Sequence, residues 1–170
     1  MPPNHRRSAQ FADGAPLDAT NLRLLAELQA DARLSLAELG RRVGLSSPAV
    51  AERLQRLEDD GVIRGYHAEL DPRALGFALS VVIRIRPAPR ELHAVADLAR
   101  ATPEVVECRR ITGDDCYVML AHVRSVEHLE EVIDRFAAHG QTTTSIVQSS
   151  PVPPRGVLLA AGEPSQRRTG

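Results

Sequence analysis

The sequence predicts an α+β protein in which a helix-turn-helix unit, winged-helix-like in outline, precedes a ferredoxin-like βαββαβ domain. Apolar residues recur with helical spacing as far as Leu57, and from Ala78 onward they alternate in short runs. A chain of 170 residues with 43% hydrophobic content can also form two small cores. The predicted parts are a disordered arm at 1–16, a helix-turn-helix domain at 17–62, a linker or ribbon at 63–77, a sheet domain at 78–150 and a disordered tail at 151–170.

The first two helices are predicted from their caps and their apolar spacing. Asp18 can cap the first helix, and Ser35 stands in the capping-box relation to Glu38 at the start of the second. Gly44 ends the second helix. The inward stripes are Leu24, Leu25 and Leu28 in the first helix and Leu36, Leu39 and Val43 in the second.

The third helix is predicted to begin with Ser47 as its N-cap and Pro48 at its first position, and to end at Gly61 in a left-handed cap. Two helices joined by a short glycine-containing turn are typical of a helix-turn-helix, whose second helix enters the major groove of DNA. With Val50, Leu54 and Leu57 inward, the opposite face is available for DNA. The predicted DNA-facing residues are Ser46, Ser47, Pro48, Ala49, Glu52, Arg53 and Arg56.

Charge supports DNA binding only locally, because the whole chain has a formal net charge of -1. Every basic residue apart from histidine is an arginine, and the window from Arg33 to Arg56 holds five arginines and two glutamates, a local charge of +3. A three-helix packing unit with solvated arginines is the alternative interpretation. The following run, VIRGYHAEL, fits a short wing, a hinge or the first strand of a sheet.

The second half predicts strands and helices in the order β-α-β-β-α-β. The predicted strands cover 80–87, 105–112, 116–123 and 141–148, and the predicted helices lie within the runs 91–102 and 125–140. Ser125 caps the second of these helices, Gly140 lies just past its end, and TGDD at 112–115 is a hairpin signal. An antiparallel sheet with both helices on one face leaves the other face for a partner, most simply a second copy of the chain.

Other site types find little support in the sequence. Cys108 and Cys116 match neither a disulfide scaffold nor a zinc site, so we expect buried free thiols in a reducing cytoplasm. The six histidines lack metal-binding spacing, no nucleotide-binding or hydrolase motif occurs, and no apolar run approaches the roughly 20 residues that span a bilayer. We therefore expect no cofactor, no metal, no enzymatic activity and no membrane partner.

The motifs together resemble the Lrp/AsnC family of prokaryotic transcription regulators. The matching stretches include SSPAVAERLQRLEDDGVIRGY at 46–66, ITGDDCY at 111–117 and TTTSIVQSS at 142–150. The resemblance implies a cytoplasmic regulator that binds double-stranded DNA, forms a homodimer assembling to a tetramer or octamer, and responds to an amino acid or related small molecule. The effector residues that it implies are Thr112, Gly113, Asp114, Asp115, Cys116, Thr142, Thr143 and Thr144.

Two positions depart from the family pattern. The family usually has an aspartate where this chain has Cys116, and an acidic residue where it has Asn21. The loss of a carboxylate at Cys116 motivates the hypothesis that the effector is absent or is not a simple α-amino acid. A solvated hairpin turn without a ligand is the alternative for the region 112–115.

Two other functions remain open. Sirohaem decarboxylases resemble this family in both domains, and His122, Arg109 and Arg110 could contribute to such a tetrapyrrole pocket. A ligand sensor that has lost DNA binding is the third possibility. The outward arginines of the third helix favour the regulator.

Overall fold

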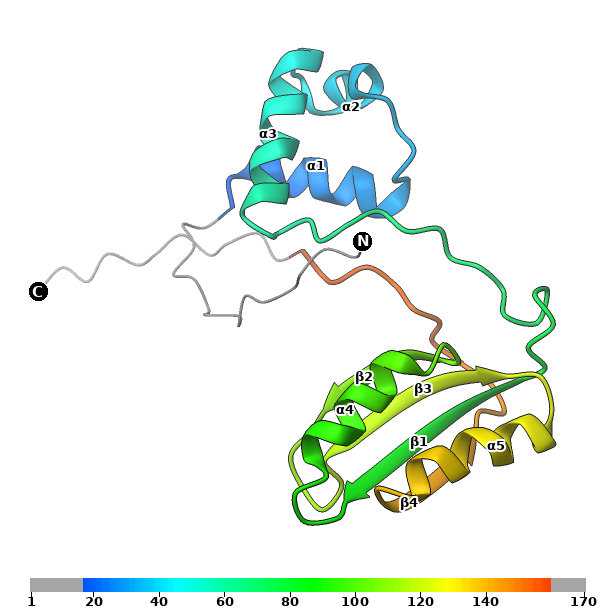
Figure 1. The fold of residues 1–170 in the computed structure, drawn as a ribbon. Coiled ribbons are helices and arrows are strands. Elements are labelled where there is room, and N and C mark those ends of the chain that lie inside the picture. Colours follow the sequence, from blue (N-terminus) through cyan, green and yellow to red (C-terminus); the bar gives the residue numbers. More distant parts are fainter. Residues whose placement is uncertain (1–16, 160–170) are drawn as a thin grey trace, which may run out of the picture. The chain divides into compact units, whose positions relative to one another are not determined.

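The computed structural model describes residues 17–159, which form two compact units (Figure 1). Within this range the helical unit comprises 17–67 and 154–159, and the sheet unit comprises 68–153. The predicted arm at 1–16 and the end of the predicted tail, 160–170, lie outside the described residues. None of the described helices is long and apolar enough to cross a membrane.

Three helices build the first unit: α1 (Ala19–Ala30), α2 (Leu36–Val43) and α3 (Ser47–Asp59). The predicted caps are confirmed, because Asp18 accepts a 2.6 Å hydrogen bond from the N–H of Asn21 and Ser35 accepts one of 3.2 Å from that of Glu38. The buried core of this unit consists of Leu24, Leu25, Leu39, Val43, Val50, Leu54 and Leu57.

The prediction that Ser47 caps α3 is wrong by one residue. Ser46 has the extended backbone of an N-cap and accepts a hydrogen bond from the N–H of Ala49, so Ser47 is the first helical residue and Pro48 the second. Only residues 44–46 separate α2 from α3, and Gly44 has the left-handed φ of 76°. At the other end Gly61, with φ of 69°, lies where the left-handed cap was predicted.

The segment that follows α3 contains no strand between Asp60 and Ala78, so of the two predicted alternatives, linker and ribbon, the structure shows a linker. The run VIRGYHAEL has no regular secondary structure and no partner strand. Tyr66 connects this run to the helical unit, because its hydroxyl donates a 2.9 Å hydrogen bond to Glu58 near the end of α3. Burial of the Tyr66 hydroxyl and the neighbouring Glu58 carboxylate raise the pKa of Tyr66 to about 12.

The second unit has the predicted order: β1 (Leu79–Pro87), α4 (Leu92–Ala101), β2 (Val105–Arg110), β3 (Tyr117–Val123), α5 (Val126–Ala137) and β4 (Gly140–Ile146). The four antiparallel strands lie in the order β2-β3-β1-β4. Figure 1 shows α4 and α5 on the same side of this sheet. The buried core lies between them and the sheet: Val81, Ile83, Ile85, Val95, Ala99, Tyr117, Met119, Ala121, Val123, Leu129, Val132 and Phe136.

Gly140 has a different role from the one that its place after α5 suggested. It is the first residue of β4, opposite Pro87 of β1. A Cβ at this position would overlap the carbonyl oxygen of Arg86. Close approach of two backbones therefore requires this glycine, whereas a left-handed turn does not.

The start of the predicted disordered tail is packed in the structure. Residues 154–159 belong to the helical unit, and the half-buried Leu159 packs against its core. Gly156 lies so close to the side chain of Gln29 that a Cβ would overlap it. The helical unit is thus assembled from two separate stretches of the chain.

Candidate functional site

The exposed start of α3 is the candidate nucleic-acid interface. Val50, Leu54 and Leu57 are buried on the opposite side of the helix, which leaves Ser46, Pro48, Glu52 and Arg56 exposed and Ser47 and Ala49 half-buried. Glu52 and Arg56 form an ion pair one helical turn apart. This pair holds the Arg56 guanidinium on the outer face of the helix.

Arg53 does not belong to that outer face. Its guanidinium donates hydrogen bonds of 2.6 Å to the Asp18 carboxylate and 2.9 Å to the side-chain oxygen of Asn21, both at the start of α1. The N–H of Asn21 first, and then Arg53, lower the pKa of Asp18. In this structure Arg53 joins α3 to α1, and the assignment of Arg53 to the DNA-facing surface stays a prediction.

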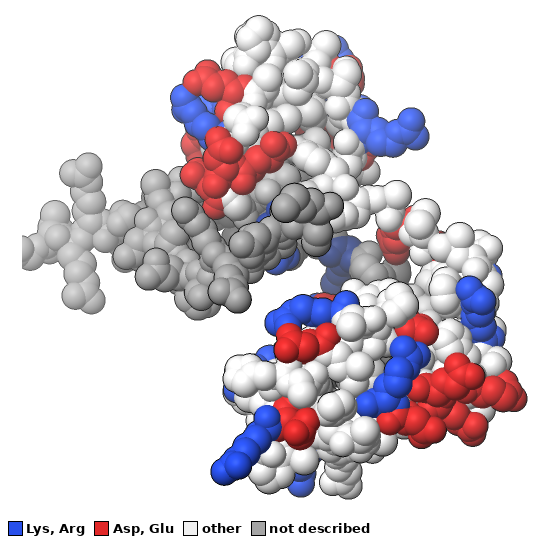
Figure 2. Space-filling model, in the orientation of Figure 1, with Lys and Arg blue, Asp and Glu red and all other residues white. Residues whose placement is uncertain are grey.

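Most of the local positive charge of this unit is paired. Glu38 accepts hydrogen bonds from Arg41 and Arg42, which lower its pKa to about 2, and Arg42 also pairs with Glu27 at 2.7 Å. Figure 2 shows arginines and acidic side chains next to each other on the visible face of each unit. The count of +3 along the sequence thus overstates the free positive charge.

The candidate effector site is the loop at 111–116 between β2 and β3. Gly113 has φ of 112°, which a residue with a side chain rarely adopts. The loop is closed by hydrogen bonds from Ile111 N–H to the Cys116 carbonyl and from Cys116 N–H to the Ile85 carbonyl. Within the described residues, the N–H groups of residues 112–115 have no protein acceptor. Consecutive free amides of this kind can bind an anion.

Two arginines of β1 lie next to the two aspartates of this loop, Asp114 and Asp115. Arg86 donates a 2.9 Å hydrogen bond to the carbonyl of Asp114 and lies 3.4 Å from its carboxylate, and Arg84 lies 3.9 Å from the carboxylate of Asp115. Sequence reasoning missed both arginines. The signal was present in VVIRIR, where the two charged residues alternate with buried ones on the strand that pairs with β3.

The three threonines of β4 do not converge on the loop. Thr143 lies opposite Arg84, on the sheet face that the helices leave open. Thr142 and Thr144 lie opposite the buried Ile85 and Ile83, so they belong to the helix-covered face. The structure therefore places only Thr143 on the same face as an arginine that contacts the loop.

The residues considered for a tetrapyrrole pocket are divided between the two sheet faces. Arg109 pairs with Glu107, and His122 shares a 2.9 Å hydrogen bond with Ser80, both on the open face. Arg110 lies opposite the buried Tyr117 and so belongs to the helix-covered face. A single pocket cannot use all three from one side.

The cysteines are free, as expected, but the prediction that they are buried is wrong for both: Cys108 is exposed and Cys116 is half-buried. Among residues 17–159, no three side chains of histidine, cysteine, aspartate or glutamate are grouped so that they could hold a metal ion.

Comparison with known proteins agrees with both units. The family model for winged helix-turn-helix DNA-binding domains matches residues 17–64, and the model for Lrp/AsnC ligand binding domains matches residues 80–157. An uncharacterized HTH-type transcriptional regulator of Bacillus subtilis is 42% identical over 134 residues, which cover 79% of this chain and 95% of that protein. The leucine-responsive regulatory protein of Escherichia coli is 35% identical over 141 residues, covering 79% and 86%.

Solved structures show the same architecture. LrpC of Bacillus subtilis matches with a TM-score of 0.76 and 32% identity, over 80% of this chain and 97% of that one. A transcriptional regulator of Neisseria meningitidis, solved as a complex with L-methionine, matches with a TM-score of 0.75 and 30% identity over 84% and 96%. With a DNA-binding unit and a ligand-binding unit in the same order as in these relatives, the chain belongs to the Lrp/AsnC family of transcription regulators.

Proposed function

We propose that the protein reads DNA with the start and outer face of α3, in the cytoplasm, and that its activity lies in regulation and not in catalysis. The observation that carries the proposal is the tip at the start of α3, the second helix of the helix-turn-helix, where Ser46 and Pro48 are exposed and Ser47 is half-buried. Small side chains at this tip permit close approach to base edges, and Arg56, about two to three turns further along the helix, can reach a base or a phosphate. In this proposal Arg53 lies outside the surface, because its hydrogen bonds hold it at the start of α1.

The test is fluorescence anisotropy on DNA from upstream of the protein's own gene, against scrambled DNA of the same length, across a salt series. We expect tighter binding to the upstream DNA and a steep loss of affinity with salt, because each neutralised phosphate releases counterions. Equal binding to both DNAs at every salt concentration would contradict sequence-specific recognition. Absent binding in low salt would favour a sensor without DNA binding.

For the effector, we infer that an amino acid or related small metabolite binds at the hairpin loop. The free N–H groups of residues 112–115 suit its carboxylate, and Asp115 suits an ammonium group. Arg84 competes with the ammonium group for Asp115, and their present separation of 3.9 Å marks a weak pair that a ligand can displace. An amino acid in its zwitterionic form would therefore replace the ion pair between Arg84 and Asp115 with one between its own ammonium group and Asp115.

Isothermal titration with the twenty amino acids tests this inference. Asp115→Asn should weaken the binding of an amino acid more than that of its 2-oxo acid analogue, because only the amino acid has an ammonium group that pairs with the Asp115 carboxylate. If the 2-oxo acid binds more tightly than the amino acid, the effector is an anion held by Arg84 and the free amides. If neither binds, the loop is a solvated turn.

We also propose a homodimer formed through the open face of the sheet, with tetramers or octamers built from it. Val82, Val118 and Leu120 are only half-buried on this face, which is more apolar than an exposed surface needs to be. A dimer would present two copies of α3 to two DNA half-sites. Light scattering coupled to size-exclusion chromatography should show no monomer at micromolar concentration, and Leu120→Asp should produce one.

A further inference from the structure

A cavity of about 510 Å³ lies in the sheet unit between α4 and the edge strand β2. Ala96 and Ala99 of α4 face Val105 and Cys108 of β2 across it. These side chains are small on both sides, so helix and strand cannot fill the space between them. The cavity has the size of a small-molecule site, and it shares no residue with the loop at 111–116 or with Thr142–Thr144.

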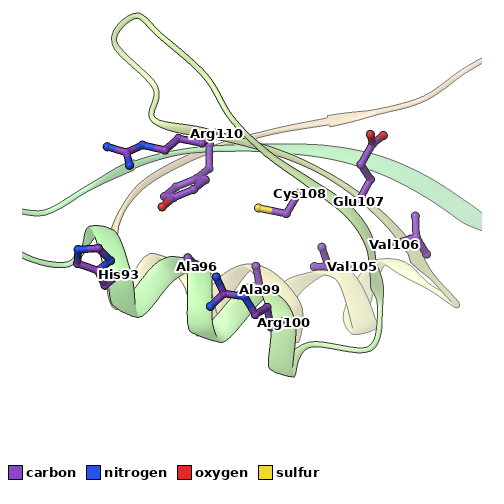
Figure 3. Close-up of a pocket in the computed structure, with 10 residues that line it drawn as sticks. His93, Ala96, Ala99, Arg100, Val105, Val106, Glu107, Cys108 and Arg110 are labelled. Atoms are coloured by element: carbon purple, nitrogen blue, oxygen red, sulfur yellow. The ribbon is translucent and has the colours of Figure 1, made fainter. Parts of the chain in front are cut away.

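Unbalanced positive charge borders the cavity. Figure 3 shows Arg110 of β2 and His93 of α4 toward one end of it. Within the described residues, neither an ion pair nor a hydrogen bond engages the Arg110 guanidinium. Arg100 also lines the cavity, and its carboxylate partner, Asp97, is solvent-exposed.

The one acidic residue at the cavity does not offset this charge. Glu107 extends from β2 away from α4 in Figure 3, and its carboxylate is paired with Arg109. An anion that enters from the His93 end would therefore meet Arg110 without competition from a neighbouring carboxylate.

Cys108 contributes an apolar wall and not a nucleophile. Although the Cys108 side chain is exposed toward the cavity, the protein atoms around its thiol displace water and raise the pKa of the thiol. The neutral form therefore dominates near neutral pH, and a neutral thiol packs as a small apolar group. The cavity thus combines an apolar floor with one basic end, and its chemistry is that of reversible binding.

We propose that this cavity binds a small carboxylate with an aliphatic body, the carboxylate at Arg110 and the aliphatic chain over Ala96, Ala99 and Cys108. The site lies within one chain, on the helix-covered side of the sheet. It would give the regulator a second ligand input that is independent of the hairpin loop and of the effector proposed there.

Titration of the full-length protein with butyrate, hexanoate, octanoate and 1-octanol, followed by calorimetry and by NMR of labelled protein, tests the proposal. We expect octanoate to bind with a dissociation constant on the order of 1 mM or tighter. Affinity should rise about three- to fourfold per methylene from butyrate to octanoate. The neutral 1-octanol should bind at least about tenfold more weakly than octanoate, since it lacks the charge that Arg110 recognises.

Arg110→Gln should weaken octanoate binding by about tenfold or more. The control is Arg124→Gln, an exposed arginine of the same unit that does not line the cavity, and it should leave octanoate binding unchanged. Ala96→Leu, which fills the cavity on a helix that tolerates leucine, should abolish binding. Absence of saturable octanoate binding, or equal effects of the two arginine variants, would overturn the proposal. If Ala96→Leu does not fold, the two arginine variants decide the question by themselves.

Discussion

At the scale of single residues, Arg53 is the clearest case of a side chain whose role depends on its neighbours. It follows the exposed Glu52 on α3, yet its guanidinium donates hydrogen bonds to Asp18 and Asn21 at the start of α1. We expect Arg53→Ala to lower the free energy of unfolding of the helical unit by about 0.5–1 kcal/mol, the range for a partly exposed ion pair. Urea unfolding followed by circular dichroism measures this loss. DNA affinity, corrected for the folded fraction, should stay within twofold of the parent value, and a larger loss would return Arg53 to the DNA surface.

Arg56 should behave in the opposite way. Its ion pair with Glu52 is largely exposed on both sides and adds little to stability. Arg56→Ala should leave unfolding almost unchanged and weaken specific DNA binding by roughly 1–3 kcal/mol if the guanidinium reads a base. Anisotropy on specific and scrambled DNA separates this from a phosphate contact, for which the loss is the same on both. Unchanged affinity on both DNAs would remove Arg56 from the interface.

Residue roles were harder to predict than residue positions. The heptad-like spacing of Val50, Leu54 and Leu57 fixes which face of α3 is buried, but Arg53 lies at the edge of that face, where a long side chain can turn either way. The choice between Ser46 and Ser47 as N-cap depends on backbone angles that two adjacent serines do not reveal. Side chains alternate between the two faces of a β-strand, so Thr143 and its neighbours Thr142 and Thr144 lie on opposite faces and cannot contribute to one site as a group.

At the scale of elements, the turn between α2 and α3 depends on Gly40. Replacing a helical glycine by alanine usually stabilises a helix by about 1 kcal/mol. Here a Cβ at position 40 would overlap the carbonyl oxygen of Leu45, so the same substitution should destabilise the helical unit. We expect Gly40→Ala to lower the free energy of unfolding by about 1–3 kcal/mol, the usual cost of overpacking. The control is Ala37→Gly, at an exposed position of the same helix, which should cost about 1 kcal/mol through propensity alone.

The start of β2 is joined to α5 by a charged cluster. Glu104 accepts hydrogen bonds of 2.8 Å from His128 and 3.2 Å from Arg135. Burial raises the pKa of the Glu104 carboxyl, but these hydrogen bonds outweigh it and lower the pKa to about 2. A carboxylate whose pKa falls on folding stabilises the fold above its unfolded pKa, and this contribution disappears as the pH falls toward the folded value.

The sheet unit should therefore lose stability between about pH 4.5 and pH 2, by at most ~3 kcal/mol from this group, given the shift from 4.5 to about 2. Urea unfolding of Glu104→Gln and of the parent protein across this range tests the expectation. The variant should be less stable at pH 7 and should show a flatter pH dependence. Parallel curves for the two proteins would assign the acid sensitivity to other carboxylates.

The elements themselves were largely predictable, because caps and periodicity are local. Asp18, Ser35 and Ser125 cap their helices as expected, and all four strands of the sheet unit were found from alternation. The ribbon after α3 was not predictable in the same way. A run such as VIRGYHAEL becomes a strand only if another strand pairs with it, and sequence pattern alone does not supply that partner.

At the scale of the whole molecule, the helical unit depends on the C-terminal segment. Leu159 packs against the core of α1, α2 and α3, and residues 154–159 belong to that unit. We expect a chain truncated after Pro153 to lose about 1 kcal/mol of helical-unit stability, because half-buried aliphatic surface returns to water. Hydrogen exchange should locate the loss in α1, with the sheet unit unchanged. Truncation after Leu159 is the matched control, and equal exchange in the two truncated chains would contradict the role of the segment.

This arrangement also affects when, during synthesis, the helical unit reaches its full stability. The ribosome releases α1, α2 and α3 first, but residues 154–159, which complete their core, emerge only after the entire sheet unit. Domains generally fold as they emerge, N-terminal parts first. A nascent chain would therefore carry a folded sheet before its helical unit reaches full stability, so that the DNA-reading part matures only once the ligand-sensing part is already in place.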